Sequence, residues 1–222
     1  MMSDILPILA SKVYSNVISR GEPPDVYLTF DDGPDPRFTP RLLEILEGYE
    51  AKATFFLTGK KAEKHPDIVK SILRADHTIG NHGYKHRSFF FRSRKDILED
   101  VNRSTGVISD ITGCSPKLFR PPHGHITPWF LSFARDLDLN VVLWSLNAGD
   151  YLATPPTIIE RRVAWRARSS DIVLLHDGVK YADNTLMAIP RILESLRQRD
   201  LYTGALNDKG ACEIQSGNVD DS

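Results

Sequence analysis

Short apolar runs alternate with amphipathic stretches along the 222 residues of the chain. The runs are rich in β-branched and aromatic residues and are bounded by turn residues, which is typical of buried strands. They predict strands at residues 26–30, 54–57, 78–80, 117–119, 141–144 and 172–175. Strands that alternate with helices indicate an α/β architecture, and no internal repeat or low-complexity linker divides the chain.

Several helix starts are marked by capping residues and prolines. Thr39-Pro40 and Thr127-Pro128 each place an N-cap residue before a proline in the first turn. Ser93 with Asp96 resembles a capping box, and Pro66 opens another amphipathic stretch. We expect a helix to begin at each of these four places.

The same patterns predict one catalytic domain over residues 25–207. An N-terminal segment, 1–24, has apolar residues at roughly helical spacing, and a polar tail, 208–222, is expected to fray. Residues 1–20 lack the basic region and continuous apolar core of a signal peptide, and no stretch reaches the length of a membrane span. On this basis the expected location is the cytoplasm.

Composition narrows the class of partner. Apolar residues make up 41% and charged residues 26% of the chain, as in ordinary globular proteins, and the net charge of −1 gives no electrostatic footprint for nucleic acid. Cys114 and Cys212 are the only cysteines. Two free thiols are the simpler interpretation, with a single bridge as the alternative. No sequence feature specifies an oligomeric state.

Charged or imidazole side chains follow five of the predicted strands. The residues found after these strands are, in chain order, Asp31 and Asp32, then Asn81, His82 and the nearby His86, then Arg120, Pro121, Pro122 and His123, then Asn147 and Asp150, and finally His176 and Asp177. In an α/β barrel the C-terminal ends of the strands converge on the face that carries catalytic residues. Five such strand ends therefore favour an enzyme.

A metal site is expected at this face. His82 and His86 are four residues apart, and Asp32 completes a set of two histidines and one carboxylate. Such a set suits zinc with open positions and also suits iron or cobalt. Asp31, beside the ligand Asp32, is placed to act as a general base. His65 and His77 are interpreted as solvated bystanders.

The reaction also needs a proton donor, for which His176 is the candidate because an imidazole titrates near neutral pH. The alternative is an ordinary hydrogen-bonded histidine. Arg120 is interpreted as a charge partner of Asp31, or else as a surface ion pair. Asp150 would orient His176 or pair with Arg120, unless it only forms part of the turn at 147–150.

With these residues in place, the chain resembles the polysaccharide deacetylase family, also called the NodB homology domain or carbohydrate esterase family 4. The resemblance covers roughly residues 25 to 205, with motifs in the family order. They are Thr-Phe-Asp-Asp-Gly-Pro-Asp at 29–35, Asn-His-Gly-Tyr-Lys-His at 81–86, Phe-Arg-Pro-Pro-His-Gly at 119–124 and Leu-Leu-His-Asp at 174–177. The implied fold is a distorted (β/α) barrel of about seven parallel strands with outer helices.

The resemblance also implies a role for each motif. Asp31 is the implied base and His176 the implied acid, and the implied ligands are Asp32, His82 and His86. The third motif would line one wall and supply a backbone N–H to the oxyanion. The implied substrate-binding residues are Pro122, His123, Tyr151, and Leu174 or Leu175 on an apolar wall for the acetyl methyl group.

Three motifs depart from the family pattern. Gly83 stands where Ser or Thr is usual, and His123 stands where the family has Tyr or Trp. The fourth motif, commonly Asp-x-x-Asp-Trp, reads Asn147-Ala148-Gly149-Asp150-Tyr151 here. None of these changes removes a metal ligand, the base or the acid.

The sequence thus predicts a metal-dependent hydrolase that removes acetyl groups from N-acetylated sugars such as chitooligosaccharide or peptidoglycan. One divalent ion is implied, with zinc favoured over cobalt, nickel, iron or manganese. The alternatives are O-deacetylation of acetylated xylan and a catalytically inactive sugar-binding protein. The loop Ser88-Phe89-Phe90-Phe91-Arg92 either stacks on sugar rings or is buried under a helix.

Overall fold

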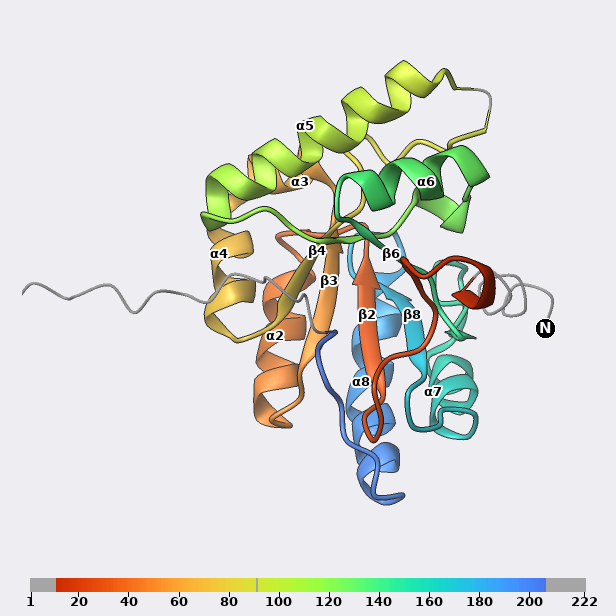
Figure 1. Cartoon of the computed structure of the whole chain (residues 1–222). Coiled ribbons are helices and arrows are strands. Elements are labelled where there is room, and N and C mark those ends of the chain that lie inside the picture. The colour runs from red at the N-terminus through yellow and green to blue at the C-terminus, as the bar shows by residue number, and fades with distance from the viewer. Residues whose placement is uncertain (1–10, 91, 207–222) are drawn as a thin grey trace, which may run out of the picture.

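The computed structural model describes residues 11–90 and 92–206 and shows a parallel sheet covered by helices (Figure 1). Its strands are β1 (Val17–Ile18), β2 (Tyr27–Asp31), β3 (Ala53–Leu57), β4 (Thr78–Asn81), β5 (Leu118–Phe119), β6 (Asn140–Val142), β7 (Leu146–Asn147) and β8 (Ile172–His176). Its helices are α2 (Thr39–Gly48), α3 (Gly59–Lys64), α4 (Pro66–Arg74), α5 (Arg94–Thr112), the 3₁₀ turn η1 (Pro122–Gly124), α6 (Pro128–Asp136), α7 (Pro156–Ala164) and α8 (Ala182–Arg197).

The eight strands described form one curled sheet in the order β1-β6-β5-β4-β3-β2-β8-β7, and every neighbouring pair is parallel. The predicted barrel-like fold is confirmed, with eight strands where about seven were expected. The six predicted strands are present. β1 and β7 were missed because two residues carry no periodicity, and β1 lies in a stretch whose spacing indicated a helix.

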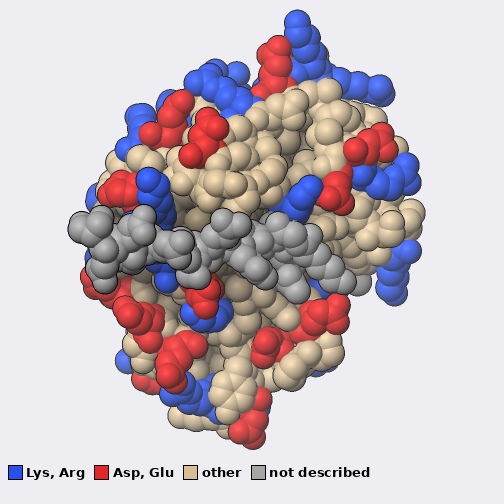
Figure 2. All heavy atoms as spheres, turned by 60° about the vertical axis from the view of Figure 1, so that its left-hand side comes forward, with Lys and Arg blue, Asp and Glu red and all other residues tan. Residues whose placement is uncertain are grey.

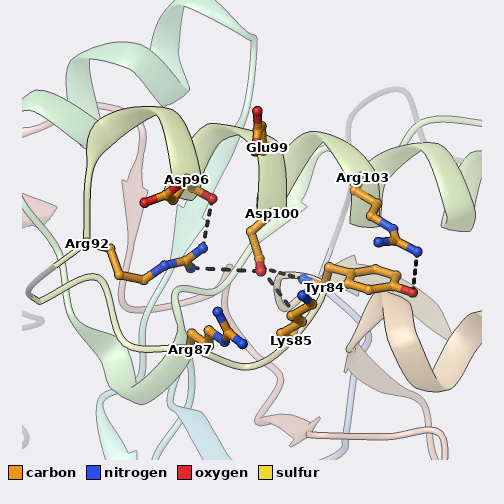
Figure 3. Close-up of a pocket in the computed structure, with 8 residues that line it drawn as sticks. All are labelled: Tyr84, Lys85, Arg87, Arg92, Asp96, Glu99, Asp100 and Arg103. Atoms are coloured by element: carbon orange, nitrogen blue, oxygen red, sulfur yellow. Dashed lines mark hydrogen bonds and ion pairs between the residues drawn. The ribbon is translucent and has the colours of Figure 1, made fainter.

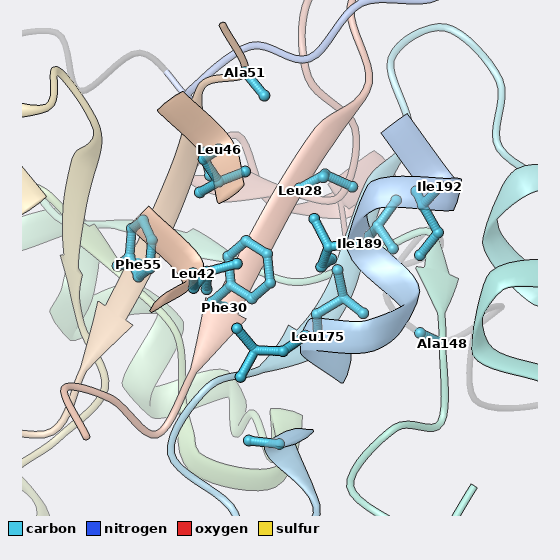
Figure 4. Close-up of a cluster of buried hydrophobic side chains, with 14 of the residues drawn as sticks. Leu28, Phe30, Leu42, Leu46, Ala51, Phe55, Ala148, Leu175, Ile189 and Ile192 are labelled. Atoms are coloured by element: carbon cyan, nitrogen blue, oxygen red, sulfur yellow. The ribbon is translucent and has the colours of Figure 1, made fainter. Parts of the chain in front are cut away.

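Side chains alternate between the two faces of the sheet, and this alternation divides the core. Along β8, Val173 and Leu175 pack toward the helices with residues of α2 and α8 (Figure 4). Ile172 and Leu174 lie on the inner face with Tyr27, Phe56 and Trp144. Asp31, four residues after Tyr27 on β2, shares the inner face by the same period. The pleat therefore directs Asp31 and Leu174 into the barrel.

The helix starts agree with the sequence, but neither threonine caps its helix through its side chain. Thr127 is at the N-cap position of α6 and makes no side-chain capping hydrogen bond. Ser93 caps α5, because its side chain accepts the backbone N–H of Asp96. Thr39 is the first residue of α2 rather than its N-cap. Its hydroxyl instead donates to Asp177 at 2.5 Å, so it ties the start of α2 to the loop after β8.

The state of Cys114 in the structure differs from the free thiol expected from the sequence. This cysteine is disulfide-bonded, so the interpretation of two free thiols is wrong. The other cysteine of the sequence, Cys212, lies outside the described residues.

The face seen in Figure 2 carries Lys and Arg interspersed with Asp and Glu, as the net charge of −1 suggests. Among residues 11–90 and 92–206, no helix is both long and apolar enough to span a membrane.

His77 is buried, so its assignment as a solvated bystander is wrong. It is only 5% exposed, it accepts the backbone N–H of Ala53 through Nδ1, and its ring packs on Phe55. Burial, with a smaller effect of Lys52, lowers the pKa of His77 to about 4.

This shift predicts a loss of stability in mild acid. A histidine with a lowered folded-state pKa binds more protons when unfolded, so the free energy of unfolding should fall as the pH drops from 6.5 to 4, by up to about 3 kcal/mol. Urea unfolding across this range measures the slope. His77→Gln, which keeps an acceptor for Ala53, should flatten the slope, whereas His65→Gln should not. Equal slopes in the two variants would contradict the assignment.

Candidate active site

The carboxyl ends of β2, β4 and β8 place the candidate side chains around one cavity of about 400 Å³. Asp31 is in parallel register with His176 on the neighbouring strand, so base and acid candidates are adjacent in the sheet. The lining residues are Asp31, Asp32, His82, His86, His123, Gly124, Trp144, Asn147, Tyr151, Leu174 and His176. The predicted convergence of strand ends is thus present.

Asp32, His82 and His86 form a group suited to hold a metal ion, as predicted, with one ligand atom of each within 4.8 Å of the others. Asp32 Oδ1 lies 3.6 Å from His82 Nε2 and 3.1 Å from His86 Nε2. This oxygen is buried and has no hydrogen-bond partner. A buried carboxylate oxygen without a donor is costly unless a cation occupies the space that it faces.

The spacing of these atoms fits a small divalent cation. Nitrogen and oxygen ligands lie about 2.0–2.2 Å from zinc in tetrahedral geometry, which separates the ligand atoms by roughly 3.3 Å. The two separations from Asp32 Oδ1, 3.1 and 3.6 Å, bracket that value. The group therefore fits zinc with a fourth position left for a further ligand.

The protonation of His82 also suits a metal ligand. Its Nδ1 lies 2.7 Å from the carbonyl oxygen of Arg120, which can only accept, so Nδ1 carries the proton. Burial lowers the pKa of His82 to about 3, although the charge of Asp32 opposes this shift. At neutral pH the ring is therefore neutral, with the Nε2 lone pair facing the carboxylates.

Arg120 holds Asp31 in place. Its Nη1 donates at 2.7 Å to Asp31 Oδ1 and to Thr29 Oγ1, and the arginine side chain is fully buried. The contact is therefore an interior ion pair rather than a surface one. Asp31 Oδ2 remains on the side of the ligand group, 3.7 Å from His82 Nε2.

Asp150 contacts His176 and not Arg120, so the first of the two partners expected for Asp150 from the sequence is the one observed. Asp150 Oδ1 lies 2.9 Å from His176 Nδ1, and Oδ2 accepts the backbone N–H of His176 and the hydroxyl of Thr185. Burial acts to lower the pKa of His176, but the charge and hydrogen bond of Asp150, with the charges of Asp31 and Asp32, raise it to about 9. His176 is therefore protonated at neutral pH.

The turn that carries His82 and His86 is fixed from helix α5. Asp100 Oδ2 accepts the backbone N–H of Tyr84 at 2.7 Å, as Figure 3 shows for a neighbouring pocket. Gly83 has φ +75°, a conformation that is unfavourable for a residue with a side chain. Glycine adopts this conformation without the steric cost that a side chain would add.

The predicted substrate-binding residues divide between the cavity and the core. His123, Tyr151 and Leu174 line the cavity, whereas Leu175 packs against the helices on the other face of β8. Pro122 is buried in the 3₁₀ turn and is not part of the cavity wall. The geometry thus favours Leu174 over Leu175 for the apolar wall.

Three further residues shape the site and were given no role from the sequence. Lys61 on α3 donates to the carbonyl oxygens of Asp32 and Gly178 at 2.8 Å, which joins the loops after β2 and β8. Trp144 lines the cavity. Asp177 is fully buried, and burial raises its pKa to about 7. Only the position of Asp177 after a strand gave a signal.

A parallel sheet that gathers a metal-ligand group, a carboxylate held by arginine and an imidazole held by aspartate defines a metal-dependent hydrolase of the (β/α)-barrel type. The profile of the polysaccharide deacetylase family matches residues 19–142. The chain belongs to this family, as the sequence motifs predicted.

Individual relatives agree. The chain is 36% identical over 180 residues to a peptidoglycan-N-acetylglucosamine deacetylase of Bacillus cereus, covering 78% of this chain and 82% of the relative. It is 30% identical over 194 residues to a chitooligosaccharide deacetylase of Sinorhizobium fredii, covering 82% and 90%. A crystal structure of the Bc1960 peptidoglycan N-acetylglucosamine deacetylase superposes with a TM-score of 0.84 at 30% identity, covering 88% of this chain and 92% of that one.

Proposed function

We propose that this protein is a metal-dependent deacetylase that hydrolyses the acetamide of N-acetylglucosamine units in an oligo- or polysaccharide. The observation that carries the proposal is the register of β2 and β8, which places Asp31 and His176 side by side at the ligand group. Relatives named for peptidoglycan and chitooligosaccharide deacetylation support this substrate class.

Asp32, His82 and His86 would hold the metal, for which we propose zinc. When bound, the ion supplies Lewis acidity to the acetyl carbonyl and to a water molecule. Asp31 would take the proton of that water through Oδ2, because Oδ1 is held by Arg120. Leu174 would contact the acetyl methyl group, and the backbone N–H of His123 would donate to the oxyanion.

His176 would supply the proton that the departing amine needs. Its Nδ1 proton is held by Asp150, so Nε2 is the nitrogen that can donate into the cavity. With its pKa raised to about 9, the imidazolium is populated at neutral pH. Arg120 and Asp150 would act as positioning residues, since neither lines the cavity.

Acetate release tests the proposal directly. N-acetylglucosamine oligomers, peptidoglycan fragments and acetylated xylan are incubated with the protein, with a chelator and then with added zinc. We expect release from the amino sugars that the chelator abolishes and zinc restores. Release from xylan alone would make the protein an O-deacetylase. No release from protein shown to hold the metal would favour an inactive sugar-binding role.

A further inference from the structure

A row of rings leads out of the cavity on the side of His86. The centroid of His123 lies 4.6 Å from that of His86, His125 follows at 5.6 Å, and Phe90 lies 4.2 Å beyond His125. His86 and His123 line the cavity, whereas His125 and Phe90 are not part of its wall. The outer two rings, tilted by 38° to each other, therefore form a contacting pair just outside the cavity.

The exposure of Phe90 is unusual for its surroundings. Its neighbour Phe89 is 4% exposed and packs against Phe119 and Phe130 in the core, whereas Phe90 is 52% exposed. Phe89 thus anchors the loop and leaves the ring of Phe90 free to contact a ligand. Of the two interpretations of this loop from the sequence, burial holds for Phe89.

Hydrogen bonds fix the Phe90–His125 pair before any ligand binds. Ser88 Oγ lies 2.8 Å from His125 Nδ1 and accepts the backbone N–H of Phe90 at 3.2 Å. One serine therefore connects the two residues whose rings are in contact. A surface held in this way loses little conformational entropy on binding.

We propose that Phe90 and His125 bind a pyranose ring of the glycan chain, next to the unit whose acetyl group enters the cavity. The inference rests on the proposed function and adds to it a binding site for the neighbouring sugar unit. The C–H faces of a pyranose are apolar and pack on aromatic rings, while its hydroxyl groups remain in water. The row of rings is continuous with the cavity and extends beyond it, as a chain-binding surface requires.

The test compares chain lengths. Acetate release is measured on N-acetylglucosamine and on its oligomers of two to six units with the wild type, Phe90→Ala and Phe90→Tyr. Phe90→Ala should raise the KM of the oligomers that reach the pair about threefold to tenfold and leave kcat nearly unchanged. The single sugar, which has no neighbouring unit to contact the pair, should be hydrolysed as by the wild type. Phe90→Tyr, which keeps the ring, should retain wild-type KM values.

Trp165→Ala is the matched control. Trp165 is 79% exposed and follows α7, at the end of that helix remote from the carboxyl edge of the sheet. Thermal melting verifies that each variant is folded. The proposal is overturned if Phe90→Ala shows the same dependence on chain length as Trp165→Ala.

Calorimetric titration with the same oligomers separates this inference from the proposed function. If the wild type released no acetate, the proposed function would fail, but affinity that rises with chain length and is lost in Phe90→Ala would still support the Phe90–His125 pair. Equal affinity of Phe90→Ala and wild type for every length would overturn the pair whatever the activity.

Discussion

Asp31→Asn is expected to reduce acetate release by roughly a hundredfold to ten-thousandfold, the usual contribution of a general base. An amide cannot accept the proton of the attacking water, so the loss should appear in kcat. The three proposed ligands are unchanged, and zinc content after dialysis should match the wild type. Steady-state kinetics and elemental analysis measure the two properties on the same preparation.

The substitution also leaves the buried Arg120 guanidinium without its charge partner, so stability must be followed in parallel. Asp171→Asn is the matched control. Asp171 is 5% exposed and pairs with Arg20 at 3.0 Å, but it precedes β8 at the opposite edge of the sheet. Its variant should lose stability and keep turnover. Near wild-type turnover in Asp31→Asn would remove Asp31 from the role of base.

Asp150→Asn is expected to shift the pH dependence of the reaction. His176 must be protonated to donate, so kcat/KM of the wild type should fall as the pH rises through about 9. Without the charge of Asp150, burial dominates and the pKa of His176 drops. The falling limb should then move by one unit or more toward acid. Profiles of kcat/KM between pH 5 and 10 measure the shift.

Thr185→Val supplies the control for this experiment. It removes a hydrogen bond to Asp150 Oδ2 but leaves the carboxylate charge beside His176. Its falling limb should stay near that of the wild type. If Asp150→Asn and the wild type had the same limb, His176 would not be the group whose protonation controls the reaction.

The sequence could predict the face that carries the site because the evidence was local. Five apolar runs end in polar side chains, and parallel strands bring such ends to one edge. Contacts between distant segments were not predictable. Lys61 is one of three lysines in α3, and nothing in the sequence distinguishes it from Lys60 and Lys64. The burial of His77 depends in the same way on packing against β3.

Strand register and loop conformation decide the points that the sequence left open. Leu174 and Leu175 are the same type of residue, so the sequence does not distinguish them. Only the pairing of β8 with β2 shows which one faces the barrel. A one-residue change in pairing exchanges the two faces. The contacts of Asp150 were undecided for a similar reason, since the loop from β7 to α7 has no period that indicates where its side chains point.

The bridge that Lys61 forms between the carbonyl oxygens of Asp32 and Gly178 bears on how such a protein can diversify. Because one ammonium group ties the loop that carries the proposed ligand Asp32 to the loop that follows the proposed acid His176, substitutions in either loop are expected to disturb both. Residues 88–90 and 123–125, which carry rings of the row beside the cavity, take no part in that bridge. New substrate preferences are therefore expected to arise through changes in these two segments, while the proposed proton-transfer machinery is inherited as a unit.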